Sequence, residues 1–342
     1  MPVMALDRRH IMWRRVKVPL IVGIGVLVLA ILGTGAFFLI RSAVIRSAVE
    51  KAMGSMALDT VGGVRGAVAS LEDLASDHPG RKDVEAALAY ALVMDAMRNG
   101  PPEPGVERAR KAISMSDGVG GGPVFHAASI LVLVAEGKPD EAVAYSGRLP
   151  KETFERDEVK LAKALALANS GNDLEARVEL ELMAVEDDPY LPAITVLGQV
   201  RQRLGLNEAA VALLRSSLEK HPGRLDAQLT LALALVETGT PDALAEAEKI
   251  MAAVGGEIGG APPHVATRGF YARGLLLSAH GKHGEAVDPL AKAMEGMAGN
   301  ALVVARCARA RRLSGDPVGA FDTLAGLEIG AHDFLVRPID RN

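Results

Sequence analysis

The sequence contains little cysteine and few aromatic residues. Its 342 residues include a single cysteine, Cys307, and aromatic side chains make up only 4% of the chain. One cysteine excludes an intramolecular disulfide and a cysteine-rich zinc site. The scarcity of aromatic residues disfavours β-sandwiches, whose strands are rich in aromatic and β-branched side chains. The apolar residues, 49% of the chain, are mostly Ala, Leu and Val, which suits closely packed helices.

The chain also lacks a large excess of charge of either sign. It has 38 basic and 42 acidic residues, and therefore a formal net charge of −4. Proteins that bind nucleic acid typically carry a basic surface. We therefore expect no nucleic acid among the partners.

One segment near the N-terminus has no charged residue at all. Residues 18–40 are twenty-three uncharged, mostly apolar residues between Lys17 and Arg41. As a helix they would extend about 34 Å, enough to cross a hydrocarbon core of about 30 Å. A cleaved signal peptide is the alternative, but the apolar run continues past the poor cleavage site at residues 34–36. The sequence therefore predicts a single transmembrane helix over residues 18–40, in contact with the lipid bilayer.

Basic residues flank this segment unevenly. Five lie within residues 1–17, whereas Arg41, Arg46 and Lys51 follow the apolar run. The side with more Lys and Arg usually stays in the cytoplasm. We therefore expect residues 1–17 to be a short cytoplasmic tail at the inner (cytoplasmic) membrane. The C-terminal body would be extracytoplasmic, and periplasmic in a Gram-negative bacterium.

A pattern recurs along the rest of the chain. The stretch HPGRKDVEAALAYAL begins at His78, and the similar stretch HPGRLDAQLTLALAL begins at His221. Between and beyond them, a glycine is followed five residues later by Ala and, after four more, by a mostly large apolar residue. These glycines lie 34 residues apart in two runs: Gly137, Gly171, Gly205 and Gly239, then Gly281 and Gly315. After Gly239 an insertion displaces the Ala to about Ala247. A fixed period of this length is typical of arrays of helical hairpins.

The pattern resembles the tetratricopeptide repeat. The best unit, LGQVRQRLGLNEAAVALLRSSLEKHP, runs from Leu197 to Pro222 and carries the Leu-Gly pair, a second Gly seven residues later, the Ala and the closing Pro. The resemblance covers residues 48–334. It implies an all-α fold, a right-handed superhelical solenoid of seven or eight helix-turn-helix repeats preceded by the transmembrane helix. We expect a juxtamembrane connector over 41–60, the repeat domain over 61–334 and a tail over 335–342.

Three details sharpen or depart from this resemblance. Small residues stand where the two helices of a pair must approach closely: Ala164, Gly198, Ala232, Gly274 and Ala308. The large packing positions, often aromatic in the family, are mostly Leu or Val. Pro289 falls inside an expected second helix, so that helix should kink or start late.

Patterns that carry catalysis or metal binding are missing. His280, His283 and Glu285 fall in a turn without the third and fourth ligands that zinc requires nearby in sequence. The run Gly118–Gly122 lacks the Lys-Ser/Thr of a phosphate loop, which favours an ordinary loop. Cys307 lies on an apolar helix face, as a small buried hydrophobe would. We therefore expect no enzyme activity, cofactor or metal. A hydrolase whose site is assembled from distant positions is the remaining alternative.

The resemblance implies that partners bind the concave surface lined by the first helix of each pair. The corresponding positions are apolar over most of the array, polar in its middle and basic at its end: Leu131, Leu161, Leu165, Gln199, Gln202, Leu229, Leu233, Tyr271, Leu275, Arg306, Arg309 and Arg312. Such a groove suits a protein partner that supplies an amphipathic helix or an extended apolar segment. The alternative is that the apolar residues pack between hairpins and the arginines form the solvated face of a terminal cap.

Two functions fit these expectations. The first is a membrane-tethered scaffold or assembly factor for an envelope complex. The second is an accessory or sensor subunit of a membrane-bound enzyme or signalling complex.

Overall fold

The structure is a computed structural model that describes residues 32, 34–100, 102–185, 189–297 and 300–325. The chain forms two compact units, residues 1–51 and residues 52–342. In the first unit, residues 34–51 are helical. The expected cytoplasmic tail, most of the expected membrane span and the tail over 335–342 lie outside the described residues. Within the described part, no helix has the length and apolar character needed to cross a bilayer.

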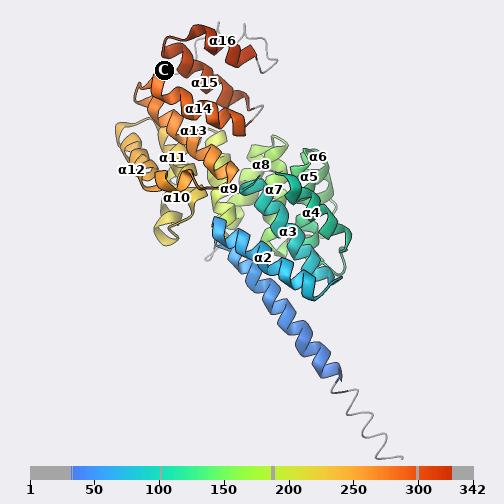
Figure 1. The fold of residues 1–342 in the computed structure, drawn as a ribbon. Helices are drawn as coiled ribbons and strands as arrows, with labels where there is room; N and C mark the ends of the chain where they lie inside the picture. The colour runs from blue at the N-terminus through green and yellow to red at the C-terminus, as the bar shows by residue number, and fades with distance from the viewer. Residues whose placement is uncertain (1–31, 33, 101, 186–188, 298–299, 326–342) are drawn as a thin grey trace, which may run out of the picture. The chain divides into compact units, whose positions relative to one another are not determined.

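The second unit is built from helices throughout its described length, with no strand (Figure 1). After residues 52–57, which are helical, the described elements are α2 (Val61–Asp77), α3 (Lys82–Arg98), α4 (Pro102–Ser114), α5 (Gly122–Ala135), α6 (Pro139–Ser146), η1 (Lys151–Glu155), α7 (Asp157–Asn169), α8 (Asp173–Ala184), α9 (Leu191–Arg203), α10 (Asn207–Lys220), α11 (Leu225–Thr238), α12 (Pro241–Ile258), α13 (Pro263–Ala279), α14 (His283–Gly296), α15 (Ala301–Leu313) and α16 (Pro317–Ala325). The predicted all-α class is confirmed for these residues.

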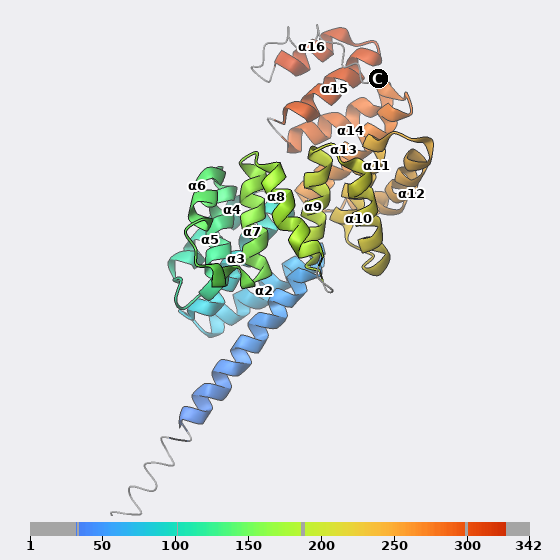
Figure 2. The ribbon, with the colours of Figure 1, turned by 180° about the vertical axis from the view of Figure 1, so that it is seen from behind.

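The helices are arranged as successive hairpins. Helices α5, α7, α9, α11, α13 and α15 each pack against the following second helix and against a first helix of a neighbouring hairpin (Figure 2). The first helices are therefore enclosed on several sides, and α11 buries eleven of its fourteen residues. This stacking is how a solenoid builds a continuous core from units too small to have one alone. The handedness of the superhelix stays a prediction.

The glycines of the repeat end the first helices as the sequence predicted. Gly137, Gly171, Gly205, Gly239, Gly281 and Gly315 all adopt φ between 74° and 93°. This left-handed conformation closes a helix C-terminus, and glycine adopts it without a Cβ clash. The alanine that follows is buried in each hairpin, as at Ala176 and Ala210, which are 0% exposed.

The close approach within hairpins is also confirmed. A Cβ added at Gly198 of α9 would lie 2.8 Å from Cδ1 of Leu214 on α10. At Gly274 of α13 it would lie 2.5 Å from Cγ of Leu290 on α14. Both distances are too short for real contacts, so these helices pack closely because the residue is glycine.

Of the two alternatives for Pro289, a late start of α14 is wrong, and a kink stays a prediction. The helix begins at His283 and continues through the proline to Gly296. Proline has no amide hydrogen, so the carbonyl four residues earlier, that of Glu285, loses its helical donor. Pro289 is itself buried among the hairpins, and this packing offsets the lost hydrogen bond.

A sealed cluster of charges joins parts of the second unit that are distant in sequence. Asp59, in the turn before α2, pairs with Arg98 at the end of α3 and with Arg224, whose Nη1 lies 3.3 Å from Oδ2. Its carboxylate also accepts a hydrogen bond of 2.5 Å from Thr195 of α9. The Asp59 side chain is 0% exposed and that of Arg224 is 1% exposed. Asp226 pairs with Arg98 and, at 2.8 Å, with Arg268.

A candidate binding pocket between helices α11, α13, α14 and α15

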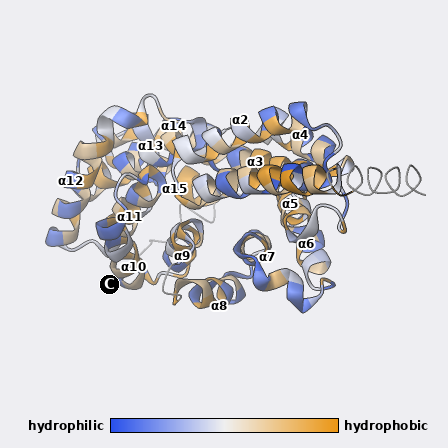
Figure 3. Ribbon diagram, turned by 90° about the horizontal axis from the view of Figure 1, so that it is seen from below, coloured by the Kyte–Doolittle hydropathy of each residue, from blue (hydrophilic) through white to orange (hydrophobic). Residues whose placement is uncertain are grey.

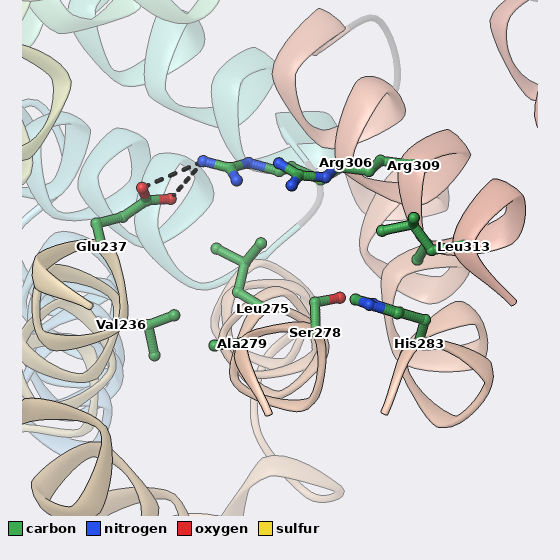
Figure 4. Close-up of a pocket in the computed structure, with 10 residues that line it drawn as sticks. Val236, Glu237, Leu275, Ser278, Ala279, His283, Arg306, Arg309 and Leu313 are labelled. Atoms are coloured by element: carbon green, nitrogen blue, oxygen red, sulfur yellow. Dashed lines mark hydrogen bonds and ion pairs between the residues drawn. The ribbon is translucent and has the colours of Figure 1, made fainter. Parts of the chain in front are cut away.

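A pocket of about 170 Å³ lies where four helices near the end of the array meet (Figure 4). Helices α11, α13, α14 and α15 each contribute to its lining. The lining residues are Val236, Glu237, Leu275, Ser278, Ala279, His283, Arg306, Arg309, Ala310 and Leu313. The pocket therefore combines apolar side chains with charged and polar groups, the usual composition of a small binding site.

An ion pair spans one side of the pocket. The Arg306 side chain on α15 reaches across to Glu237 at the end of α11 (Figure 4). Its Nη2 donates to both carboxylate oxygens of Glu237, at 2.9 and 3.1 Å. The side chains are 30% and 19% exposed, so solvent still reaches this pair. It joins two helices of hairpins that are not adjacent in sequence.

A second arginine in the pocket has no carboxylate partner. Arg309, one turn after Arg306 on α15, is exposed, and no ion pair or hydrogen bond to another described residue involves its guanidinium. With two arginines and one glutamate, the lining carries a formal charge of +1 if His283 is neutral. Nδ1 of His283 is buried without a hydrogen-bond partner. The pocket thus offers a free cation and an unsatisfied imidazole nitrogen beside an apolar wall.

The structure brings together three of the twelve residues predicted to line a binding groove. Leu275, Arg306 and Arg309 all face this one pocket. Arg312 is exposed but lies outside it. The repeat positions alone did not separate the two arginines inside the pocket from the one outside.

The other predicted groove residues lie elsewhere in the array. Five are buried between helices: Leu131, Leu161 and Leu229 at 0% exposed, Leu233 at 6% and Tyr271 at 8%. Leu165, Gln199 and Gln202 are half-buried. Burial raises the pKa of Tyr271 to about 12, so its phenol stays protonated near neutral pH. The buried members of this set pack the array and leave little side chain for a partner.

Sequence reasoning did not assign Glu237, His283 or Leu313 to a binding site, although all three line the pocket. Glu237 precedes the turn at Gly239 and shows no pattern that marks a site. His283 was considered only as a metal ligand, and Leu313 ends α15. The carboxylate that pairs with Arg306 is Glu237, 69 residues away in the sequence. Several first helices carry acidic residues, and the sequence alone does not indicate which of them Arg306 contacts.

The residues considered for other chemistry have ordinary surroundings. Nε2 of His280 lies 3.0 Å from Oε1 of Glu248, whereas His283 lines the pocket. Among the described residues, no three His, Cys, Asp or Glu side chains are placed to hold a metal ion. Cys307 is buried, and burial raises the pKa of its thiol, as expected for a small core residue. Most of the run Gly118–Gly122 forms the loop between α4 and α5, as predicted.

Comparison with known proteins supports the fold, through solved structures of low sequence identity. No family model matches the chain, and no curated protein sequence matches it. The chain is similar to one in the crystal structure of the APC/C hetero-tetramer Cut9-Hcn1, with 14% identity and a TM-score of 0.57. The match covers 85% of this chain and 55% of that one, so this chain spans about half its length. A tetratricopeptide repeat protein from Parabacteroides merdae matches at 14% identity and a TM-score of 0.47, over 79% of this chain and 98% of that one. The repeated hairpins and the first of these matches give a tetratricopeptide-like fold.

Proposed function

We propose that this protein is a membrane-tethered scaffold that holds a protein partner at the pocket between α11, α13, α14 and α15. The partner segment would place an apolar side chain against Leu275 and an acidic group beside Arg309. The observation that carries this proposal is the unpaired guanidinium of Arg309 next to an apolar wall. A charge complementary to it would orient the partner, while apolar contact would supply affinity.

The dimensions of the pocket favour a side chain or a chain end over a whole helix. Its volume of about 170 Å³ accommodates one or two side chains. Most of the partner's affinity would then come from a few anchoring residues, and the contacts around them would contribute little, as at many protein interfaces. Arg306 is already engaged by Glu237, so Arg309 is the cation that remains for the partner.

A binding role also accounts for the pocket better than hydrolysis does. Ser278 and His283 both line it, and a hydroxyl beside an imidazole is the start of a nucleophile–base pair. No hydrogen bond joins these two side chains, and the carboxylate of Glu237 is held by Arg306. A Ser278→Ala variant separates the two functions: capture of a partner should be unchanged, whereas hydrolysis would be lost.

The tether in this proposal is the uncharged run over residues 18–40, with the body outside the cytoplasm. Its support is the length of the run and the five-to-three distribution of basic residues around it. Reporter fusions after residue 100 and at the C-terminus should be active only in the extracytoplasmic compartment. Cytoplasmic activity of both fusions would reverse this topology and move the scaffold to the other side of the membrane.

Site-directed crosslinking in intact membranes tests the position of the partner. A photo-reactive residue at Leu313, on the rim of the pocket, should give a discrete crosslinked product identifiable by mass spectrometry. Leu302 is the matched control, because it is on the same helix and exposed but does not line the pocket. Equal products from the two positions, or products from Leu302 alone, would show that the partner does not sit in the pocket.

A further inference from the structure

A row of exposed apolar side chains runs along α8. They recur at helical spacing on one face of α8 and its C-cap: Leu174 is 63% exposed, Val178 52%, Leu182 69% and Val185 84%. Residues four apart on a helix lie on the same face, so these side chains form one continuous stripe. Figure 3 shows α8 at the edge of the array, with hydrophobic and hydrophilic residues along it.

This stripe distinguishes α8 from the second helices that follow it up to α14. At the end of the described array, α16 also exposes two large apolar residues, Val318 at 71% and Phe321 at 50%. Helices α10, α12 and α14 are also the second helices of their hairpins. Among their described side chains, no large apolar residue is similarly exposed. The repeat therefore does not require such residues at the outer face. Contiguous apolar patches on a protein surface usually mark an interaction site.

A groove lies beside the first half of the stripe. It has a volume of about 420 Å³ between α6, α7 and α8, with Leu167 and Val143 among its apolar lining residues. Leu174 and Val178 line its α8 side. A partner lying on the stripe can thus insert side chains into a recess as well as cover the exposed leucines.

The charged residues around the stripe indicate which charge a partner should carry. Helix α8 carries four carboxylates, and three of them are paired: Asp173 with Arg203, Glu179 with Lys163, and Glu181 with Arg201 and Arg177. Lys163, the cation lining the groove, is held by Glu179 at 2.6 Å. Glu175 also lines the groove and is exposed, and no ion pair with a described residue neutralises it. A partner with basic residues beside its apolar face meets an unneutralised carboxylate here, whereas an acidic partner is repelled.

We propose that the α8 stripe, Leu174, Val178, Leu182 and Val185, binds an amphipathic helix of another protein whose apolar face is flanked by Lys or Arg. A second copy of this chain fits less well, because two α8 stripes face to face would add no cation for Glu175, whose carboxylate has no ion pair with a described residue. An anionic lipid surface likewise offers no cation to Glu175. The inference is independent of the pocket at Arg309, since the two sites share no residue.

A pair of designed peptides tests this inference on the full-length chain in neutral-lipid nanodiscs. Both are amphipathic helices with leucines at i, i+4, i+8 and i+11; one has lysines beside the leucines and the other has glutamates. Both peptides can bury the same leucines, so a difference in affinity reports the flanking charge. Fluorescence anisotropy should show that the lysine peptide binds at least about tenfold more tightly, because its lysines pair with Glu175 whereas the glutamates are repelled by it. Equal affinity of the two peptides, or no binding of either, overturns the proposal.

Variants of exposed residues assign the binding to the stripe. The double change Val178→Gln and Leu182→Gln should weaken the lysine peptide at least about tenfold while helicity and melting stay the same, because both side chains are exposed. Glu175→Lys should reduce the preference for the lysine peptide. Leu302→Gln is the matched control on α15 and should change neither.

Other occupants of the stripe give results that contradict the proposal. If the double variant lowers the molecular mass in sedimentation and leaves peptide binding unchanged, a second copy covers α8. If it changes only flotation with anionic vesicles, the stripe contacts lipid. Arg309→Glu should leave binding of the lysine peptide unchanged, so failure of the pocket and failure of the stripe are distinguishable.

Discussion

Two arginine–carboxylate sites in this protein have the same chemistry in opposite surroundings. At Asp59 and Arg224 the side chains are 0% and 1% exposed, and Arg224 also donates hydrogen bonds to Thr195 of α9 and Ser217 of α10. At Glu237 and Arg306 the side chains are 19% and 30% exposed, and an unpaired Arg309 lies beside them. Both sites join hairpins that are distant in sequence.

The comparison shows that exposure decides what an ion pair contributes. A buried pair is held at the cost of removing both charges from water, so loss of one partner leaves a charge with no compensation. A solvated pair contributes little to stability, and its charges stay accessible to a ligand. We therefore interpret the buried Asp59–Arg224 pair as an interaction that stabilises the fold. The Glu237–Arg306 pair, with Arg309, is the site that we propose for binding.

The largest effect is expected from Asp59→Asn. Asparagine has the same size as aspartate and also tolerates the φ of 59° found at this position. The change therefore removes only the negative charge that pairs with Arg98 and Arg224. Denaturant unfolding followed by circular dichroism should show a loss of about 3 kcal/mol or more. Asp288→Asn, in an exposed pair with Lys292, is the control and should cost less than about 1 kcal/mol. Similar losses in the two variants would remove the distinction between sealed and open pairs.

A smaller effect is expected from Glu237→Gln at the open site. Because solvent screens this pair, the free energy of unfolding should fall by only about 1 kcal/mol or less. The same change releases Arg306 and raises the formal charge of the pocket lining from +1 to +2, so recovery of an acidic partner should increase, as measured by crosslinking at Leu313. A loss of stability as large as that of Asp59→Asn would instead make the pair a structural element.

The smallest effect is expected at Glu136, whose partners are more exposed still. A hydrogen bond from Arg110, partly opposed by burial, holds the pKa of Glu136 below its usual value. A depressed carboxyl pKa contributes stability that is present above the pKa of the unfolded chain and lost as pH falls through the folded value. Unfolding between pH 7 and pH 3 should therefore show wild type losing about 0.5 kcal/mol more than Glu136→Gln, mostly below about pH 4. Parallel pH profiles would show that this pair contributes nothing.

The sequence predicted the elements that repeat. The glycines that end first helices, the buried alanines and the close contacts at Gly198 and Gly274 each follow from a local requirement that recurs in every hairpin. A position that must be small or must adopt positive φ is occupied by the same residue type, Gly or Ala, in successive hairpins. These recurring positions can be recognised in the sequence without knowing how the hairpins are arranged in space.

What could not be predicted depends on how the array brings distant hairpins together. Asp59 lies in a segment that the sequence indicated only as a connector, and its partner Arg224 is 165 residues away. Glu237 likewise pairs with Arg306 of α15, and the sequence did not indicate that Arg309 lines the pocket whereas Arg312 does not. The exposed stripe on α8 was missed for a related reason, since periodicity alone does not say which face of a second helix is covered.

Charge reversal on α15 tests the central claim most directly. Arg309→Glu and Arg312→Glu change the same residue type on the same helix, but only the first alters the pocket. Partner recovery after crosslinking at Leu313 in membranes should fall at least about tenfold for Arg309→Glu, more at low salt than at high salt, and should stay near wild type for Arg312→Glu. Helicity and melting should be unchanged in both variants, because both side chains are exposed. Equal recovery from the two variants would contradict the account and leave the arginines as the solvated face of a terminal cap.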